Sequence, residues 1–315
     1  MNPFFLSIPS KPQNPSITYQ SNIIMVGSCF VENVQKKLSY YKLPNTCNSF
    51  GIIFHPEAID TLIKRVASQL FFTEKDLFFH NEQWHCFEVH SKFSNPDKVQ
   101  LLKNLNTILT ETYLKLKTAS HFIITYGTAW GYKKENAIVA NCHKVPQKEL
   151  TKSLSSVDAI EATFKNTFNT LKKINPSITI ITTVSPVRHI KDGIIENNLS
   201  KAHLITALHK TIKNTPNTHY YPAYELVIDC LRDYRFYKDD LVHPNQTAVD
   251  YVWEHFTQTW IYGNDTTALM KSIREIQQGI AHKPFNPESK AHQNFINALK
   301  KKQEELIKKL PFLEF

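Results

Sequence analysis

Close to its start, the chain contains the stretch Ile23-Ile24-Met25-Val26-Gly27-Ser28-Cys29-Phe30. The first four residues are apolar and three of them favour β-strands, so we expect a buried strand that ends at Gly27. Three apolar residues then follow at helical spacing: Phe30, Val34 and Leu38. This pattern predicts a helix directly after the glycine, with Ser28 and Cys29 in the sharp turn between strand and helix.

The turn is a favourable place for a nucleophile. The first N–H groups of a helix have no partner within the helix, and the helix dipole favours negative charge there. Both effects stabilise a thiolate or an oxyanion. A cysteine after a tight turn is more commonly a small buried hydrophobe, however, so the turn alone does not identify a catalytic residue.

The length of 315 residues indicates one large α/β domain, or one domain with an appendage. The five cysteines are an odd number, and the first residues do not resemble a signal peptide. We therefore expect reduced thiols and a cytoplasmic location. No apolar run approaches the length that spans a membrane.

The formal net charge of +9 at pH 7 invites comparison with nucleic-acid-binding proteins. The basic residues are spread along the chain and no known nucleic-acid motif accompanies them, which argues against such a partner. Residues 300–309 are locally rich in lysine, and Glu304 and Glu305 lie among them. We expect this segment to be a solvated helix face, with an anionic partner as the alternative.

Two further apolar runs end, like the first, at a glycine or a small polar residue. Residues 121–126 lead into Gly127 and residues 177–184 lead into Ser185. Amphipathic helical patterns separate the runs, which predicts an α/β fold with a mostly parallel sheet and helices on both faces. Because such sheets bind ligands at the carboxyl ends of their strands, we expect five residues to share one edge: Ser28, Cys29, Gly127, Thr128 and Ser185.

Two segments lie outside this alternating pattern. Residues 70–92 are rich in aromatic side chains and predict an inserted β-hairpin. Residues 264–315 predict a helical C-terminal appendage, interrupted at Pro284 and Pro287. We therefore expect a domain of residues 1–263 followed by an extension of residues 264–315.

A base for the nucleophile is offered by the sequence Asp240-Leu241-Val242-His243. At a spacing of three residues, Asp and His can lie on the same side of a helical turn. Asp240 would then bind one imidazole nitrogen, and the other nitrogen would face Cys29 or Ser28. In the alternative interpretation, Asp240 caps the next helix and His243 is a surface residue.

The segment Gly27-Ser28-Cys29-Phe30, followed by Val31-Glu32, resembles the signature of the GSCFA family. Seven more segments fit this family in order and extend the resemblance over residues 22–260: Asn48-Ser49-Phe50-Gly51, Tyr126-Gly127-Thr128-Ala129-Trp130, Asn141-Cys142-His143-Lys144-Val145-Pro146, Val184-Ser185-Pro186-Val187, Ser200-Lys201-Ala202, Tyr221-Pro222-Ala223-Tyr224-Glu225 and Asp240 to Pro244. The family is similar to the SGNH hydrolases. That similarity implies a flavodoxin-like three-layer α/β/α sandwich of the kind that carries esterases, lipases and carbohydrate acetylesterases.

The resemblance to SGNH hydrolases also implies roles for individual residues. That superfamily has Gly-Asp-Ser after its first strand, so the register places Ser28 on the aspartate and Cys29 on the nucleophilic serine. A turn one residue shorter would make Ser28 the nucleophile. Asp240 and His243 match the Asp-x-x-His of the superfamily, and the triad would be Cys29 (or Ser28), His243 and Asp240.

The same resemblance implies an oxyanion hole. The N–H of Gly51 would join that of Cys29, as in the second sequence block of the superfamily. The third block supplies an asparagine two residues after its glycine, and here that position is Ala129. We expect Thr128, or Asn141 and His143 from the following loop, to replace this donor, with Gly127 and Ser185 also lining the site.

The leading hypothesis is hydrolysis or transfer of a small acyl ester through an acyl-enzyme, without a cofactor. The substrate would be a modified sugar or cell-envelope precursor, by analogy with the fold alone. The alternative is a non-catalytic protein that binds an acylated or glycan ligand in the same cleft. A metal site would need five residues without the usual ligand spacing, which argues against a metal: Cys29, Cys142, His143, Asp240 and His243. The oligomeric state is not predicted.

Overall fold

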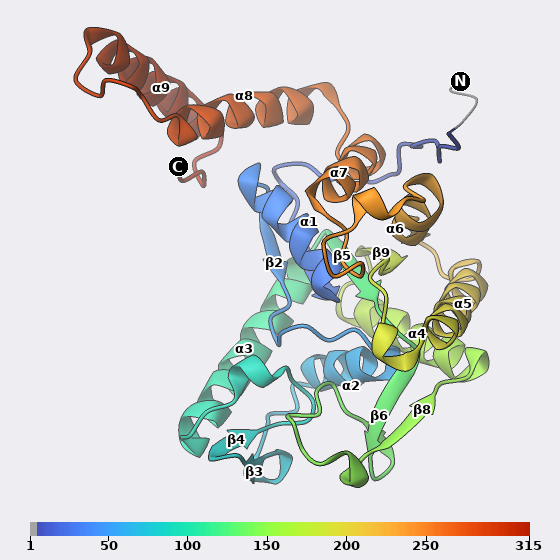
Figure 1. Ribbon diagram of the computed structural model, residues 1–315. Coiled ribbons are helices and arrows are strands. Elements are labelled where there is room, and N and C mark those ends of the chain that lie inside the picture. Colours follow the sequence, from blue (N-terminus) through green and yellow to red (C-terminus); the bar gives the residue numbers. More distant parts are fainter. Residues whose placement is uncertain (1–4) are drawn as a thin grey trace.

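A five-stranded parallel sheet forms the centre of the protein in a computed structural model that describes residues 5–315 (Figure 1). Its strands lie in the order β10-β9-β5-β1-β2, and every pairing is parallel. The bounds are Ile23–Gly27 for β1, Asn45–Cys47 for β2, His121–Tyr126 for β5, Thr179–Val184 for β9 and Thr218–Tyr220 for β10. Counted along the chain, this is the order 2-1-3-4-5 of flavodoxin-like folds. The predicted fold class is confirmed.

Alternate residues of the central strands pack into two separate cores. Ile24, Phe122 and Ile180 belong to one core, which also contains the buried faces of α2 (Pro56–Ala67), α3 (Lys98–Thr118), α4 (Val157–Ile174) and α5 (Ile194–Ile212). Ile23, Ile123 and Ile181 belong to the other, with α1 (Cys29–Tyr40) and α7 (Gln246–Trp260). Because side chains alternate between the faces of a strand, this division produces the three layers.

The central strands match the prediction because they are buried on both faces. All six residues of β5 and all six of β9 are buried, and such strands have nearly continuous β-branched or apolar sequences. The short edge strand β2 has no comparable signal in the sequence. Its three residues are only partly buried, so no apolar run marks the strand.

A small antiparallel sheet follows β5, where we predicted a long loop. It comprises β6 (Trp130–Lys134), β7 (Ala137–Ile138) and β8 (Thr151–Leu154), in the order β7-β6-β8. Its strands are short and mostly polar, which hid them from a search for apolar runs. A hairpin of β3 (Phe78–His80) and β4 (Gln83–His85) lies within residues 70–92.

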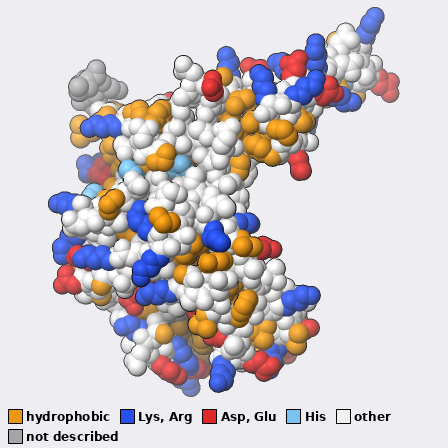
Figure 2. All heavy atoms as spheres, turned by 180° about the vertical axis from the view of Figure 1, so that it is seen from behind, with side chains coloured by type: hydrophobic (Ala, Val, Ile, Leu, Met, Phe, Trp, Pro, Cys, Tyr) orange, Lys and Arg blue, Asp and Glu red, His pale blue; other side chains and the backbone are white. Residues whose placement is uncertain are grey.

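Two helices, α8 (Asn264–Ala281) and α9 (Lys290–Lys309), form an arm that extends from the sheet domain (Figure 1). The predicted helical appendage is therefore present, and its two prolines lie between the helices. Figure 2 shows basic and acidic side chains mixed on the arm. Among residues 5–315, no helix combines the length and apolarity needed to cross a membrane. A short α6 (Ala223–Glu225) completes the helices.

Candidate active site

A cleft of about 700 Å³ opens at the carboxyl ends of β1, β5 and β9. It is the place where ligands bind in sheets of this topology. The structure brings six of the predicted site residues to its lining: Ser28, Cys29, Thr128, Asn141, Asp240 and His243. The other four predicted residues, Gly51, Gly127, His143 and Ser185, do not line it.

The β1–α1 junction separates the roles of Ser28 and Cys29. Ser28 is the N-cap of α1: its Oγ accepts the Phe30 N–H at 3.3 Å, and the residue is 4% exposed. Cys29 is the first helical residue, half-buried at the cleft. A side chain at Gly27 would place Cβ 2.3 Å from the Thr125 carbonyl oxygen, so the junction requires glycine there.

The thiol of Cys29 is not acidified by its place at the helix start, contrary to our expectation. Burial raises the pKa of Cys29, and Glu32 raises it further, whereas the Cys29 N–H, Lys238 and Lys201 act in the opposite direction. Desolvation disfavours a thiolate more than these groups favour it. The protonated thiol is therefore the favoured form of Cys29 at neutral pH.

Asp240 and His243 form the predicted pair. Asp240 Oδ2 lies 2.7 Å from His243 Nδ1, and Oδ1 accepts the N–H groups of Val242 and His243 at 2.9 Å each. The His243 N–H, then the Val242 N–H and the imidazole, hold the pKa of Asp240 down at about 2. Because Asp240 occupies Nδ1, Nε2 is the nitrogen that can accept a proton.

Arg188 connects this loop to the end of β9, a contact that the sequence did not suggest. Its Nη1 donates to the Leu241 carbonyl oxygen at 3.1 Å, and its guanidinium lies 4.3 Å from the centre of the Tyr237 ring. Leu241 has a φ of 56°, a tight turn for a branched side chain. Arg188 therefore ties a strained loop to the segment that follows β9.

The predicted oxyanion hole is wrong in its second donor. The Gly51 N–H donates to the Asn48 carbonyl oxygen at 2.7 Å, within a turn in which Gly51 has a φ of 86°. The Gly127 N–H likewise donates to the Phe54 carbonyl oxygen at 2.9 Å. Both glycines serve the backbone, so neither N–H is available to an oxyanion.

The proposed replacements for the missing asparagine differ in position. Asn141 lines the cleft, and its Oδ1 accepts the His143 N–H at 2.8 Å. Thr128 also lines it, but its Oγ1 lies 2.8 Å from Ser200 Oγ and accepts the Trp130 N–H at 3.0 Å. The amide of Asn141 is therefore the better placed donor.

Two other predicted residues lie beneath the surface rather than in the cleft. His143 is 4% exposed, its Nε2 lies 2.8 Å from the Cys86 carbonyl oxygen, and burial lowers its pKa to about 4. Ser185 is fully buried, and its Oγ accepts the Val187 N–H at 3.3 Å. Both residues stabilise loops, so the predicted substrate contacts are wrong for this pair.

The profile of the GSCFA family matches residues 22–256, well over half of the chain. The chain belongs to the GSCFA family. A second profile, described as the C-terminal domain of GSCFA domain proteins, matches residues 273–315. The resemblance expected from the sequence is confirmed, and no curated protein matches the chain.

Among solved structures, this GSCFA protein is similar to three esterases. A family 3 carbohydrate esterase from Talaromyces cellulolyticus matches with a TM-score of 0.34 and 9% identity, over 81% of this chain and 99% of that one. The Clostridium thermocellum family 3 carbohydrate esterase gives 0.35 and 7%, over 80% and 98%. An acetyl esterase S10A variant with acetate gives 0.35 and 8%, over 81% and 99%. Likeness at these scores carries no conclusion about activity.

The sequence suggested no role for two further residues of the GSCFA protein, although one of them, Lys201, lies in a segment that carries the family resemblance. His189 lines the cleft, and burial, with a smaller effect of Lys201, lowers its pKa to about 4. Lys201 is 1% exposed, and its Nζ donates to the carbonyl oxygens of Gly127 at 2.5 Å and Ser185 at 2.7 Å. The signal for Lys201 was its spacing from Leu204 and Leu208, which places it on the buried face of α5.

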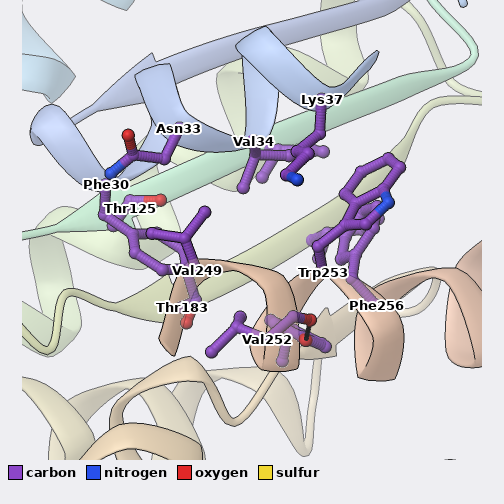
Figure 3. Close-up of a pocket in the computed structure, with 13 residues that line it drawn as sticks. Phe30, Asn33, Val34, Lys37, Thr125, Thr183, Val249, Val252, Trp253 and Phe256 are labelled. Carbon is purple, nitrogen blue, oxygen red and sulfur yellow. Dashed lines mark hydrogen bonds between the residues drawn. The ribbon is translucent and has the colours of Figure 1, made fainter. Parts of the chain in front are cut away.

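Within residues 5–315, no group of three or more His, Cys, Asp or Glu side chains could hold a metal ion. An apolar pocket lies between α1 and α7, where Figure 3 shows Phe30, Val34 and Trp253 around it. Its volume of about 20 Å³ suits one water molecule, which is too little for an ester substrate.

Proposed function

We propose that this GSCFA protein hydrolyses or transfers a small acyl ester through a thioester on Cys29. The observation that carries the proposal is that Cys29 and the Asp240–His243 pair, from distant parts of the sequence, line one cleft. A half-buried thiol, an imidazole and an orienting carboxylate are the parts of a nucleophile–base–acid triad. We favour Cys29 over Ser28 for this role because the Ser28 hydroxyl caps α1.

The chemistry follows from the orientation of the pair. His243 Nε2 accepts the Sγ proton, and the thiolate attacks the ester carbonyl carbon to form a tetrahedral oxyanion. The intermediate expels the alcohol, which takes the proton from the imidazolium, and the thioester remains. Water or another acceptor then attacks the thioester while His243 removes its proton. Asp240 stabilises the imidazolium in both halves.

The oxyanion would be bound by the Cys29 N–H, which is one of the donors without a partner at the start of α1. We assign the amide of Asn141 as a second donor, since it lines the cleft. Each donor of this kind is worth about 2–4 kcal/mol of transition-state stabilisation. Loss of the Gly51 donor therefore implies a slower reaction than a complete hole would give.

The shape of the cleft supports a small acyl group on a larger alcohol. Apolar side chains of Ile52, Phe54 and Val187 suit the acyl group, whereas Trp130 and Tyr132 offer rings for a sugar or another cyclic alcohol. The second candidate function, binding without turnover, is favoured by one observation. The N–H groups of Gly51 and Gly127 are both occupied, so the hole has fewer donors than ester hydrolysis ordinarily uses.

Peptide mass spectrometry after brief exposure to p-nitrophenyl acetate tests the proposal. We expect acetyl mass on the Cys29 peptide of the wild type, and labelling at least 100-fold slower in His243→Ala because the base is gone. Cys142→Ala is the matched control, because Cys142 is the other thiol in the cleft and its removal should leave the labelling of Cys29 unchanged.

Three results would contradict the proposal, and the third would favour the second candidate function. Label on Ser28 would overturn the assignment of the nucleophile. Label on Cys29 that does not depend on His243 would overturn the triad. Absence of label with p-nitrophenyl acetate, together with saturable binding of the ester, would favour the binding protein.

A further inference from the structure

Lys201 is a buried amine without an acidic partner. Its side chain is 1% exposed, and within residues 5–315 its hydrogen bonds go to two backbone carbonyls and to no carboxylate. Lysine is among the residues least often buried without a counter-charge, because removing an ammonium group from water is costly. A methionine would fill the same space without that cost. Packing alone therefore does not account for lysine at this position.

The two carbonyls place the amine directly beneath the cleft. Gly127 and Ser185 are the residues that follow β5 and β9. The neighbouring strand, β1, pairs with β5 and leads into Cys29, and the Ser28 N–H donates to the Thr125 carbonyl oxygen at 3.2 Å. An ammonium group has three N–H donors, and these carbonyls account for two. Lys201 thus lies at the edge of the sheet where Cys29 begins its helix.

Lys201 and Cys29 also influence each other electrostatically. Burial lowers the pKa of Lys201 to about 7, and a thiolate at Cys29 opposes this effect. In return, Lys201 lowers the pKa of Cys29 against the effects of burial and of Glu32. Lys201 also lowers the pKa of His189, in the loop after β9. The attraction between an ammonium and a nearby thiolate is weakly screened where both are sheltered from water.

We propose that Lys201 is a positioning residue that supplies, from beneath the cleft, the positive charge that stabilises the Cys29 thiolate. The inference rests on the proposed function, in which Cys29 is the nucleophile. Lys201 does not line the cleft and acts through Cys29. Its hydrogen bonds to Gly127 and Ser185 fix where the charge lies.

The test is the rate at which iodoacetamide alkylates Cys29 between pH 6 and pH 9, in a Cys142→Ala background. We expect Lys201→Met to slow alkylation about tenfold at pH 6, because an opposite charge shifts a pKa by one unit or more. The effect should shrink as the pH rises through 7 and disappear by pH 9, where Lys201 of the wild type is neutral. Lys201→Arg keeps its charge at every pH in this range. It should alkylate at the wild-type rate at pH 6, and its charge should still favour the Cys29 thiolate at pH 9.

Ser200→Ala is the matched control. Ser200 Oγ accepts the Ala129 N–H at 2.7 Å, so this variant disturbs the neighbouring loop without removing a charge. It should change the rate equally at all pH values or not at all. Identical pH profiles for wild type and Lys201→Met would overturn the inference. Acetyl labelling of Cys29 by p-nitrophenyl acetate is measured in a separate assay. A protein that fails to form the acyl-enzyme can therefore still show the effect of Lys201 on the alkylation rate.

A second measurement keeps Lys201 in place and does not depend on the folding of its variants. Cys29 is alkylated with iodoacetate, which adds a carboxylate, or with iodoacetamide, which adds a neutral amide of the same size. The lysine that titrates near pH 7 is then followed by NMR of isotope-labelled side chains. We expect its pKa to be higher in the carboxymethyl protein, and equal values in the two proteins would overturn the inference.

Discussion

Helices α4 and α5 pack side by side on the same face of the sheet, yet their first turns bury different kinds of residue. The buried face of α4 is mostly apolar, with Ile160, Phe164 and Phe168 fully buried and two threonines, Thr163 and Thr167, also buried. The first turns of α5 instead bury polar residues, Asn197, Ser200 and Lys201, while Ile194 and Ile195 are 63% and 79% exposed. The apolar pattern returns further along α5, at Leu204 and Leu208.

The difference shows where this fold departs from hydrophobic packing. The three buried polar side chains in the first turns of α5 each bind a loop that follows β5 or β9: Asn197 accepts the His189 N–H, Ser200 accepts the Ala129 N–H and Lys201 donates to Gly127 and Ser185. α4 makes no comparable contact with the cleft, whose lining includes none of its residues. The inverted pattern is therefore confined to the part of α5 that supports the candidate site.

The largest expected effect concerns the charge buried by α5. The pKa of Lys201 is about 7 in the folded protein, against an ordinary value of 10.5. Between these two values the unfolded chain holds more protons, so the free energy of unfolding should rise with pH over this range. Relative to Lys201→Met, the wild type should gain about 5 kcal/mol at most between pH 7 and pH 10.5, at 1.36 kcal/mol per unit of pKa.

Urea denaturation of both proteins across this range measures the effect. The comparison with Lys201→Met cancels the contributions of other groups that titrate at alkaline pH, including the buried tyrosines. Parallel curves for the two proteins would show that Lys201 keeps its ordinary pKa in the fold.

The second-largest expected change in the free energy of unfolding concerns the apolar side chains that α4 buries. Phe164 is fully buried and its ring centre lies 4.5 Å from that of Tyr126. Phe164→Ala should lower the free energy of unfolding by about 3–5 kcal/mol at every pH, because it removes apolar contacts and leaves a cavity. Chemical denaturation at pH 7 and pH 9 measures it, with Phe164→Leu as a milder control. A loss that varied with pH would contradict a purely apolar role.

The smallest effect concerns the exposed apolar face of α5. Ile195→Gln should change the free energy of unfolding by no more than about 0.5 kcal/mol, because the side chain already contacts water. Thermal unfolding measures this change, and Phe168→Gln on the buried face of α4 provides the contrast. A large loss in Ile195→Gln would show that the face is covered in solution.

The sequence predicted those parts of the molecule whose pattern follows burial. All residues of β5 and β9 and four of the five residues of β1 are buried, so their apolar runs revealed both the strands and the edge where they end. The pairing of Asp240 with His243 was also predictable, since both residues lie in one short loop. The spacing of two residues within a turn limits their separation regardless of the rest of the fold.

What the sequence did not predict depends on contacts between distant segments. The Gly51 N–H donates to the Asn48 carbonyl oxygen within a turn, and the residue types alone did not predict this hydrogen bond. Arg188 is adjacent to Leu241 only because the end of β9 faces the loop that contains Asp240 and His243. Lys201 contradicts the usual rule of burial, since lysine is seldom buried without a counter-charge. In each case the partner is distant in sequence or the usual rule of burial is broken.

The β1–α1 junction divides three consecutive positions into three classes of mutational tolerance. In a saturation library, position 27 should return glycine alone, because any Cβ would meet the Thr125 carbonyl oxygen. Position 28 should accept threonine, asparagine and aspartate, which cap helices as serine does. The backbone at position 29 does not depend on the side chain, so variants with many different residues there should fold. The identity of the reactive atom could therefore change over evolution while the scaffold that presents it stays the same.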